Sequence, residues 1–600
     1  MKKNIFKIAS LLAMVSLATT SCDDWLTVYP QTQIVEENFW EDKNDLEGVR
    51  YAAYKNMADQ VEKMIIWGDL RSDIYKQPTL ATGSQGNREN FKNIIYANID
   101  TTWAYYDWSG MYSTIGYCNK VLLHGEEILE KDKQFTATEW NQMKAEMVTM
   151  RALSYFYLVR AFKSIPYTTK VVSSDSEIEY FPQLPVLDVM DSLIIDVEKV
   201  AGQARNRFVK NEETRGMITN AAIYALLSDM YLWRASLREG RGMQNEAIND
   251  YQMCIYNSEM SIRKLKEQFE EEEKLQGVSF SRNDFITWTN DSIFEGSSLD
   301  FMYKNNIDRA KFGEVDLVAY RKIFGQGNSY ESIFELQFNS SDGRPNGTVN
   351  SMWGTFAGTH LVSTLAPTLK DMRYWFSAWS EVGESGIGDA YCLKWMDASP
   401  VFDPSTKGTA NPKIEMEGES EDYNNWIVYR LSDVLLNNAE ARACLMILGR
   451  DVDTNRKVCR RIIRMLNRRW WVDFENTIGV ERNLDTKMDY DIDNDNDNGE
   501  TYFNHVMNTR KIEFVGEGKR WFDLVRYAER KSATDDSKDG MTSMFEKYMT
   551  GIEGYKTIMS RCDNLWGLYC PIYYMECKAY RANGSTLTQN PVWNKSKYDR

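Results

Sequence analysis

Residues 67–75 combine aromatic rings with planar polar groups in one short stretch. Trp67 and Tyr75 supply flat apolar faces, and Asp69, Arg71 and Asp73 supply carboxylate and guanidinium groups between them. Flat rings can stack against the C–H face of a sugar, and planar polar groups can pair with neighbouring hydroxyls. The segment is therefore a candidate glycan-contact site. The same residues could instead be structural, with Trp67 in the core and Asp69 and Arg71 paired at the surface.

Further rings widen this candidate site. Tyr96 and Trp103 flank the segment, whereas Trp108 lies within a helical pattern and is expected in the core. A second group lies between about 265 and 420. There, Gly354 and Gly358 beside Trp353 predict a turn that presents the indole ring to solvent. The candidates in this second group are Trp288, Tyr303, Trp353 and Phe356.

Charged residues near the C-terminal end alternate in sign at a spacing of three. This spacing predicts ion pairs along one helix, so we interpret the group as a structural ladder and not as a catalytic carboxylate pair. We assign the same structural role to three residues upstream. The ladder is Glu513, Glu517, Arg520, Asp523 and Arg526, and the upstream residues are Arg430, Asp433 and Glu440.

An acidic run at 489–500 contains alternating Asp and Asn followed by Gly499 and Glu500. Calcium loops use such oxygen-rich turns, but the EF-hand positions of Gly and Glu are not met here. We interpret the run as a solvated loop, with a calcium site as the alternative. Its ligands would be Asp491, Asp493, Asp495 and Asp497. The three histidines lie far apart without a motif, so we expect no catalytic metal and no cofactor.

The first 21 residues have the order of a secretory signal peptide. Three lysines precede an apolar run at 8–17 that is too short to span a bilayer, and small residues lead into Cys22. A cysteine at this junction predicts cleavage before Cys22 and lipid attachment to its thiol. Asp23 and Asp24 resemble the export signal of some surface lipoproteins. We therefore expect residues 22–600 to be lipid-anchored at the outer membrane, facing the cell exterior.

Composition narrows the classes of partner. The formal net charge of −16 disfavours nucleic acid and anionic lipid surfaces and favours neutral or mixed-charge ligands. The 18 Trp and 34 Tyr exceed what a core alone requires, as expected of a protein that stacks rings on sugars. The low proline content, 12 residues in 600, favours long helices. We expect the cysteines after Cys22 to be buried thiols. A disulfide among Cys562, Cys570 and Cys577 is left open.

Helical periodicity positions most of these residues. Thr136 and Glu139 form a capping box that predicts a helix start, and Pro166 ends that helix. Further patterns predict helices over 219–235, 422–448, 502–515 and 519–530. The span 265–420 shows no sustained period and reads as loops and short helices. The class is mainly α: one domain with a helical scaffold over about 35–265 and 420–595 and a loop-rich ligand region between.

Six blocks, in order along the chain, resemble the RagB/SusD family of nutrient-binding outer-membrane lipoproteins. The set follows a lipoprotein-like leader. The blocks are Asn38-Phe39-Trp40 with 48–54; Trp108, Tyr112, Ile115, Cys118 and Asn119; AEMVTMRALSYFYLVR at 145–160 with Ile165-Pro166; YRLSDVLLNNAEA at 429–441; Arg510, Glu513-Phe514 and EGKRWFDLVR at 517–526; and Pro571-Ile572 with Gln589-Asn590-Pro591.

The resemblance implies a fold and a function. The fold would be stacked, tetratricopeptide-like helix pairs with large irregular loop excursions. The function would be non-catalytic capture of an oligosaccharide or polysaccharide and its delivery to a TonB-dependent, SusC-like barrel. Two alternatives are an α-helical glycoside hydrolase or lyase using a carboxylate pair and a purely protein-binding scaffold.

Overall fold

The computed structural model describes residues 39–76, 85–171, 179–277, 424–470 and 498–594, with single positions and short stretches between 280 and 416. Cys22, Trp288, Trp353, Phe356 and the four calcium candidates (Asp491, Asp493, Asp495 and Asp497) lie outside the described residues. Across the described residues, no helix combines the length and apolarity that a membrane span requires.

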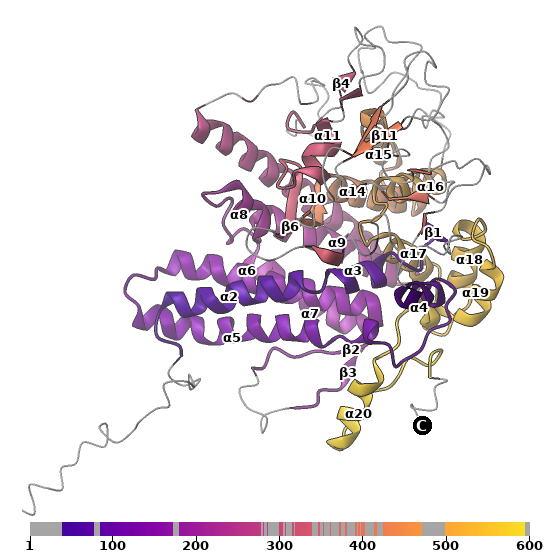
Figure 1. Ribbon diagram of the computed structural model, residues 1–600, viewed down its shortest axis with the longest axis horizontal. Helices are drawn as coiled ribbons and strands as arrows, with labels where there is room; N and C mark the ends of the chain where they lie inside the picture. The colour runs from indigo at the N-terminus through magenta and orange to yellow at the C-terminus, as the bar shows by residue number, and fades with distance from the viewer. Residues whose placement is uncertain are drawn as a thin grey trace, which may run out of the picture.

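The N-terminal part is a stack of long helices that lie side by side in Figure 1. Helix α6 begins at the expected capping box, since Glu139 N donates to Thr136 Oγ1 (3.2 Å) and Thr136 N donates to Glu139 Oε2 (2.9 Å). The stacking order is α2 on α5, α5 on α6 and α6 on α7. The bounds are α2 Lys43–Ala58, α5 Ser109–Lys131, α6 Ala137–Phe162 and α7 Val186–Val200.

A second stack continues the first and brings distant segments together. Helix α9 packs on α10 and also on α17, α10 packs on α14, and α14 packs on α15 and α16. The predicted break between the last two helices is confirmed at Gly516 and Gly518, whose φ angles are +70° and +68°. The bounds are α9 Asn220–Gly240, α10 Gln244–Gln276, α14 Leu431–Ile447, α15 Val452–Trp470, α16 Gly499–Glu513 and α17 Arg520–Arg530.

One predicted helix begins later than expected. Residues 426–430 form strand β12 (Trp426–Arg430), which pairs antiparallel with β6 (Ser332–Leu336) and leads directly into α14. Both strands are buried along their whole length. The run of aromatic and β-branched residues in Trp426-Ile427-Val428-Tyr429 suits such a strand. The helix predicted over 422–448 included this run, so the strand was missed.

Shorter elements complete the fold. The C-terminal helices α18, α19 and α20 follow α17. Small antiparallel sheets involve the middle region, and β2 and β3 pair between α6 and α7. The helices are α3 Val61–Gly68, α4 Gln85–Ile95, η3 Ala104–Tyr106, α8 Asn211–Gly216, α11 Val318–Tyr320, η6 Arg321–Gly325, α18 Asp539–Tyr548, α19 Tyr555–Cys562, η8 Leu565–Leu568 and α20 Tyr574–Ala582. The other strands are β1 Tyr75–Lys76, β2 Ile165–Pro166, β3 Gln183–Leu184, β4 Asn306–Ile307, β5 Val315–Asp316, β7 His360–Leu361, β8 Trp379–Ser380, β9 Ala390–Tyr391, β10 Ala398–Val401 and β11 Lys413–Met416.

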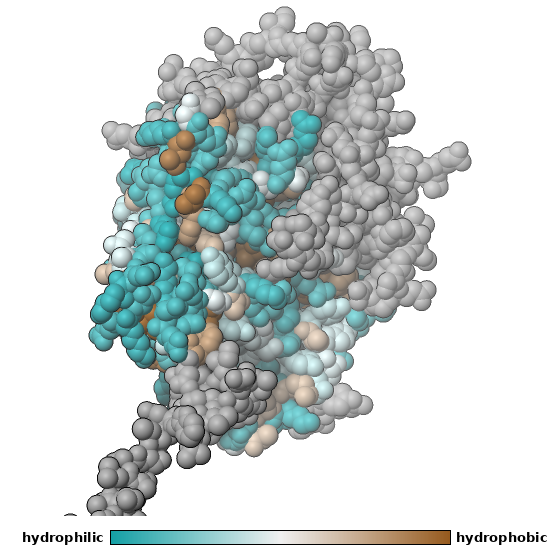
Figure 2. Space-filling view, turned by 60° about the vertical axis from the view of Figure 1, so that its left-hand side comes forward, coloured by the Kyte–Doolittle hydropathy of each residue, from teal (hydrophilic) through white to brown (hydrophobic). Residues whose placement is uncertain are grey.

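The observed architecture confirms the mainly α class with stacked helix pairs. One hydrophobic core runs from α2 to the C-terminal segment and includes Trp108, as expected. On the face drawn in Figure 2, hydrophilic residues cover most of the described surface, with a few apolar residues between them. The eight cysteines after Cys22 are buried and free, so Cys562, Cys570 and Cys577 form no disulfide in this structure.

The fold depends on a close backbone contact at the end of α3. A Cβ atom placed on Gly68 would lie 1.9 Å from the carbonyl oxygen of Gly518 and 2.9 Å from the ring of Phe522. Gly48, on the exposed side of α2, has no such neighbour within 4 Å. The chain between α16 and α17 therefore requires a glycine at position 68.

We expect Gly68→Ala to lower the free energy of unfolding by about 1–3 kcal/mol, because the methyl group forces α3 and the loop before α17 apart. The matched control, Gly48→Ala, should be neutral or stabilising by up to about 1 kcal/mol, since alanine favours a helix interior. Urea unfolding followed by circular dichroism measures both. Equal stability of the two variants would contradict this packing.

Candidate functional site

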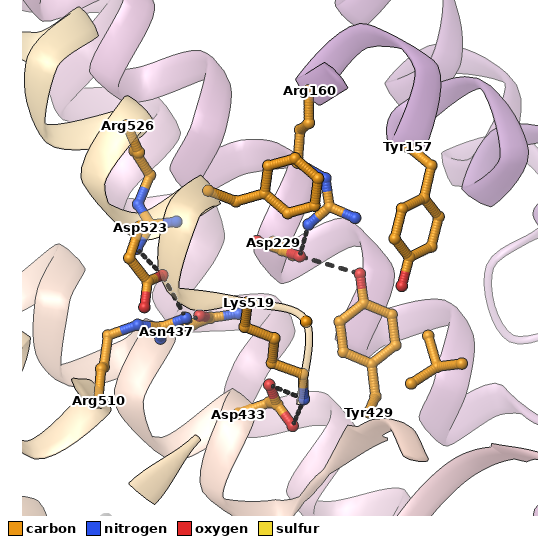
Figure 3. A pocket seen from close by; sticks show the side chains of 13 residues that line it. Tyr157, Arg160, Asp229, Tyr429, Asp433, Asn437, Arg510, Lys519, Asp523 and Arg526 are labelled. Carbon is orange, nitrogen blue, oxygen red and sulfur yellow. Dashed lines mark hydrogen bonds and ion pairs between the residues drawn. The ribbon is translucent and has the colours of Figure 1, made fainter. Parts of the chain in front are cut away.

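A small internal cavity lined by charged groups lies between α6, α9, β12, α14, α16 and α17 (Figure 3). Its volume is about 20 Å³, which is room for roughly one water molecule. Its lining contains carboxylates, guanidinium groups and tyrosines, which is the composition of many active sites. The charged and aromatic members are Tyr157, Arg160, Asp229, Tyr429, Asp433, Arg510, Lys519, Phe522, Asp523 and Arg526.

Each cavity carboxylate is already bound by a cation or hydroxyl. Arg160 (3.3 Å) and the hydroxyl of Tyr429 (3.0 Å) donate to Asp229, and Lys519 donates to Asp433 (2.7 Å). Burial would raise the pKa of Asp523, but Arg510 at 2.8 Å and Arg526 at 2.9 Å lower it below its usual range. A cavity this small cannot admit a sugar ring, so these carboxylates stabilise the helix packing and do not form a glycosidase site.

A second buried network adjoins the cavity and is centred on Arg430. Its guanidinium donates to Glu513 at 2.8 Å and to Glu517 at 2.8 Å and 3.0 Å. Lys394 also donates to Glu517 (2.5 Å), and Arg469 bridges Glu513 (3.3 Å) and Glu331 (2.6 Å). Burial would raise the pKa of Glu517, but Arg430 and Lys394 lower it to about 2.

The predicted ladder is therefore structural, as expected, but its geometry is different. Of the three predicted pairs at a spacing of three, the structure forms Asp523–Arg526 (2.9 Å). Glu517 instead pairs with Arg430, and Arg520 pairs with Asp73 at 2.7 Å. The charges face other elements inside the protein and not one another along an exposed helix surface.

The segment 67–75 is buried, and the prediction that it contacts a glycan is wrong. The exposed fractions of its five candidate side chains (Trp67, Asp69, Arg71, Asp73 and Tyr75) lie between 0% and 3%. Asp69 accepts the backbone N–H groups of Gly518 (3.3 Å) and Arg520 (3.2 Å), so it caps the start of α17 from a distant part of the chain. Its other hydrogen bond comes from the hydroxyl of Tyr75 at 2.8 Å.

The other polar groups of this segment also bind the C-terminal part. Arg71 donates to the carbonyls of Gly567 (2.6 Å) and Leu568 (3.0 Å) and lies over the ring of Trp521. Asp73 pairs with Arg520 and with Lys511 at 2.9 Å. Burial raises the pKa of Asp69 to about 7, whereas Arg520 and Lys511 overcome the effect of burial and lower the pKa of Asp73 to about 2.

Tyr303 is also a core residue and not a surface contact. Its side chain is 4% exposed, its ring stacks on Phe285 with centroids 5.0 Å apart, and its backbone N–H donates to Glu331 at 2.7 Å. The prediction of a ligand contact is therefore wrong for Tyr303. Asp371 and Arg373, from the same middle region, form a buried ion pair at 2.6 Å.

Tyr96 and Trp103 differ from the buried candidates, because both remain partly exposed on the segment between α4 and α5. The C-terminal part supports this segment. Arg561 donates to the carbonyl of Tyr96 (2.7 Å), and the N–H of Tyr574 donates to the carbonyl of Thr101 (3.0 Å). The second of these bonds brings the start of α20, with two further partly exposed rings, next to residues 101–105. We call the five rings the aromatic shelf: Tyr96, Trp103, Tyr105, Tyr573 and Tyr574.

Three of these rings were not among the predicted contacts. Tyr105 is two residues from Trp103, so its position in the sequence could have suggested it. Tyr573 and Tyr574 are an adjacent pair whose rings meet edge to face at 5.1 Å, but they lie more than 450 residues away in the chain. Only the folded structure brings them to the shelf.

Partly buried charges lie beside the aromatic shelf. Lys63 lies 3.9 Å from Asp107, and Glu62 and Glu576 also act on its ammonium group. Burial raises the pKa values of Glu62 and Glu576 and lowers the pKa of Lys63. Three carboxylates therefore surround one ammonium group, which gives this side of the shelf an acidic character.

Two known protein families together match most of the chain. The SusD family matches residues 241–593, and a family described as starch-binding and associating with the outer membrane matches residues 24–232. A curated relative, SusD-like protein P38 of Formosa agariphila, is 23% identical over 543 residues and covers 88% of this chain and 92% of its own length. SusD-like protein P2 of the same organism is 25% identical and covers 42% of this chain and 47% of its own.

Solved structures show the same fold. A SusD superfamily protein from Bacteroides fragilis has a TM-score of 0.61 at 15% identity and covers 92% of this chain and 99% of its own. A SusD homologue from Bacteroides thetaiotaomicron has a TM-score of 0.59 at 17% identity, covering 92% and 100%. A laminarin-binding SusD-like protein has a TM-score of 0.54 at 16% identity, also covering 92% and 100%.

The pKa of Asp69 predicts a measurable pH effect. An unfolded aspartate ionises near pH 4, whereas the folded Asp69 does so near pH 7, so the folded state binds the extra proton between these values. This contribution makes wild-type stability rise as the pH falls from 7 towards 4. In Asp69→Asn, we expect the stability difference from wild type to change by about 1 kcal/mol per pH unit in this range.

The matched control is Asp73→Asn, because the folded Asp73 ionises near pH 2 and does not titrate between pH 7 and 5. It should lower stability by about 3–5 kcal/mol through loss of its ion pairs, without changing the pH slope in that range. Urea unfolding at a series of pH values measures both. An unchanged slope in Asp69→Asn would contradict the assignment.

Proposed function

Because the chain belongs to the SusD family, we propose that it is a non-catalytic glycan receptor at the cell surface. It captures an oligosaccharide or polysaccharide on the aromatic shelf and delivers it to a TonB-dependent, SusC-like outer-membrane transporter. The starch-binding description of the family that matches residues 24–232 supports glycan binding, as does the laminarin-binding protein of the same fold.

The observation that carries this proposal is the partial exposure of several rings in one region. Trp103 has one side over Tyr106, with centroids 6.4 Å apart, and remains partly exposed. Tyr573 and Tyr574 contribute further rings and hydroxyl groups in the same region, since the N–H of Tyr574 donates to the carbonyl of Thr101. Rings supply the apolar faces, and hydroxyls and nearby carboxylates supply hydrogen-bond partners for a sugar.

The charges beside the shelf favour neutral sugars. In the group around Lys63, three carboxylates (Glu62, Asp107 and Glu576) face one ammonium group, so a sulfated or uronic acid chain would meet net repulsion on that side of the shelf. The chain's net charge of −16 acts in the same direction over longer distances. We infer that the captured glycan is neutral or of mixed charge.

Anchoring and delivery complete the proposal. A lipid on Cys22 would hold the protein at the outer membrane, with the shelf outside the cell, and the family description of outer-membrane association supports this location. Capture by stacking and hydrogen bonding requires no cofactor. For the acidic run 489–500, a solvated loop stays the prediction and a structural calcium ion the alternative.

We expect Trp103→Ala to weaken binding of neutral oligosaccharides by roughly three- to tenfold, because it removes one stacking face. Isothermal titration with laminari- and malto-oligosaccharides measures the affinity. Tyr256→Ala is the control, since Tyr256 is 53% exposed on α10 and is not part of the shelf. It should bind like the wild type.

The same samples test the absence of catalysis. Incubation of the wild type with either sugar series should produce no new reducing ends. Unchanged affinity in Trp103→Ala would contradict the shelf as the binding site, and release of reducing ends would contradict the non-catalytic function.

A further inference from the structure

A second group of partly exposed rings lies at the far end of α20. Tyr580, on the last turns of α20, meets Tyr180 edge to face with ring centroids 4.7 Å apart. The hydroxyl of Tyr580 donates to the carbonyl of Phe181 at 3.2 Å, and the amide of Asn583 donates to the hydroxyl of Tyr180 at 2.5 Å. These contacts hold rings from α20 and from the chain before β3 together. Figure 1 shows the ribbon of α20 below β2 and β3.

Helix α20 connects this group to the aromatic shelf. Glu576 and Tyr580 are four residues apart and share one face of the helix, and Tyr573 is the residue that precedes its first turn. The carboxylate of Glu576 acts on both tyrosine hydroxyls; burial, with Glu576 and Tyr180, raises the pKa of Tyr580 to about 12. The two tyrosines are seven residues apart, or roughly 10 Å along the helix axis, which is longer than a single sugar ring.

The polar groups at this end suit an uncharged chain of sugars. Asn583 and the tyrosine hydroxyls can exchange hydrogen bonds with sugar hydroxyls. Lys170 lies over the ring of Phe181 at 5.4 Å and also pairs with Glu179 at 2.6 Å, so the local positive charge is balanced. The group therefore shares rings and hydrogen-bonding groups with the shelf, and α20 itself carries charges of both signs, Glu576 with Lys578 and Arg581.

We propose that Tyr180, Phe181 and Tyr580 form a second sugar-binding subsite, which continues the aromatic shelf along α20. One oligosaccharide chain then lies across both ends, with its first units at Trp103 and Tyr573 and later units at Tyr580. This inference rests on the proposed function and extends it: the protein selects chains of several units over short ones.

The test is the dependence of affinity on chain length. Laminari- and malto-oligosaccharides of two to eight units are titrated into the wild type, a Tyr180→Ala/Tyr580→Ala double variant and Trp103→Ala. For the wild type, affinity should rise by about tenfold between the short and long members of a bound series. The double variant should bind short members like the wild type and lose most of that rise, because only the remote subsite is removed.

Two controls separate the loss of rings from a change in folding. Tyr580→Phe keeps the ring and loses the hydrogen bond to Phe181, so it should keep most of the length dependence. Tyr256→Ala on α10 should match the wild type. The thermal unfolding temperature of each variant shows that α20 remains folded.

The outcomes distinguish the subsite from the proposed function. A full rise of affinity with length in the double variant, or no rise in the wild type, would overturn the second subsite and leave the shelf intact. Failure of the wild type to bind either series would contradict the proposed function and this inference with it. Loss of short-chain binding in the double variant would also contradict it, because these residues would then belong to the first subsite.

Discussion

The arrangement of this protein depends on a buried cluster of ion pairs around Arg430. Its guanidinium joins the start of α14 to Glu513 and Glu517, at the junction between α16 and α17. Each of these groups has been taken out of water, so each must keep its partner: an unpaired buried charge costs about 3–5 kcal/mol. The cluster therefore permits few alternative positions for the junction, although the pairs need not add net stability over an apolar core.

Residues 67–75 link the junction between α16 and α17 to the candidate binding surface. Asp69 and Asp73 bind the start of α17, and the indole of Trp67 donates to the carbonyl of Tyr105 at 2.8 Å. Tyr105 belongs to the aromatic shelf. The segment thus fixes the position of the partly exposed rings relative to the C-terminal helices. A binding surface for a rigid sugar benefits from such a fixed base, because little side-chain freedom is lost on binding.

Local patterns predicted the scaffold well and the site poorly, for a physical reason. The capping box at Thr136, the helix periodicity and the glycines at 516 and 518 are local signals, and the structure confirms them. The roles of Asp69 and Asp73 are set by partners almost 450 residues away, which no spacing rule reveals. The same holds for Tyr573 and Tyr574. Rings and charges in residues 67–75 resembled a sugar site because buried contacts between distant helices and glycan contacts use the same residue types.

A crystal structure of the protein with the longest neutral oligosaccharide that it binds tests the central claim most directly. The account predicts an intact sugar chain with one unit against the ring of Trp103 and another near Tyr573, while the internal cavity beside Asp229 holds no sugar. Sugar bound on a face without these rings, or a cleaved chain held by the carboxylates of the cavity, would contradict it.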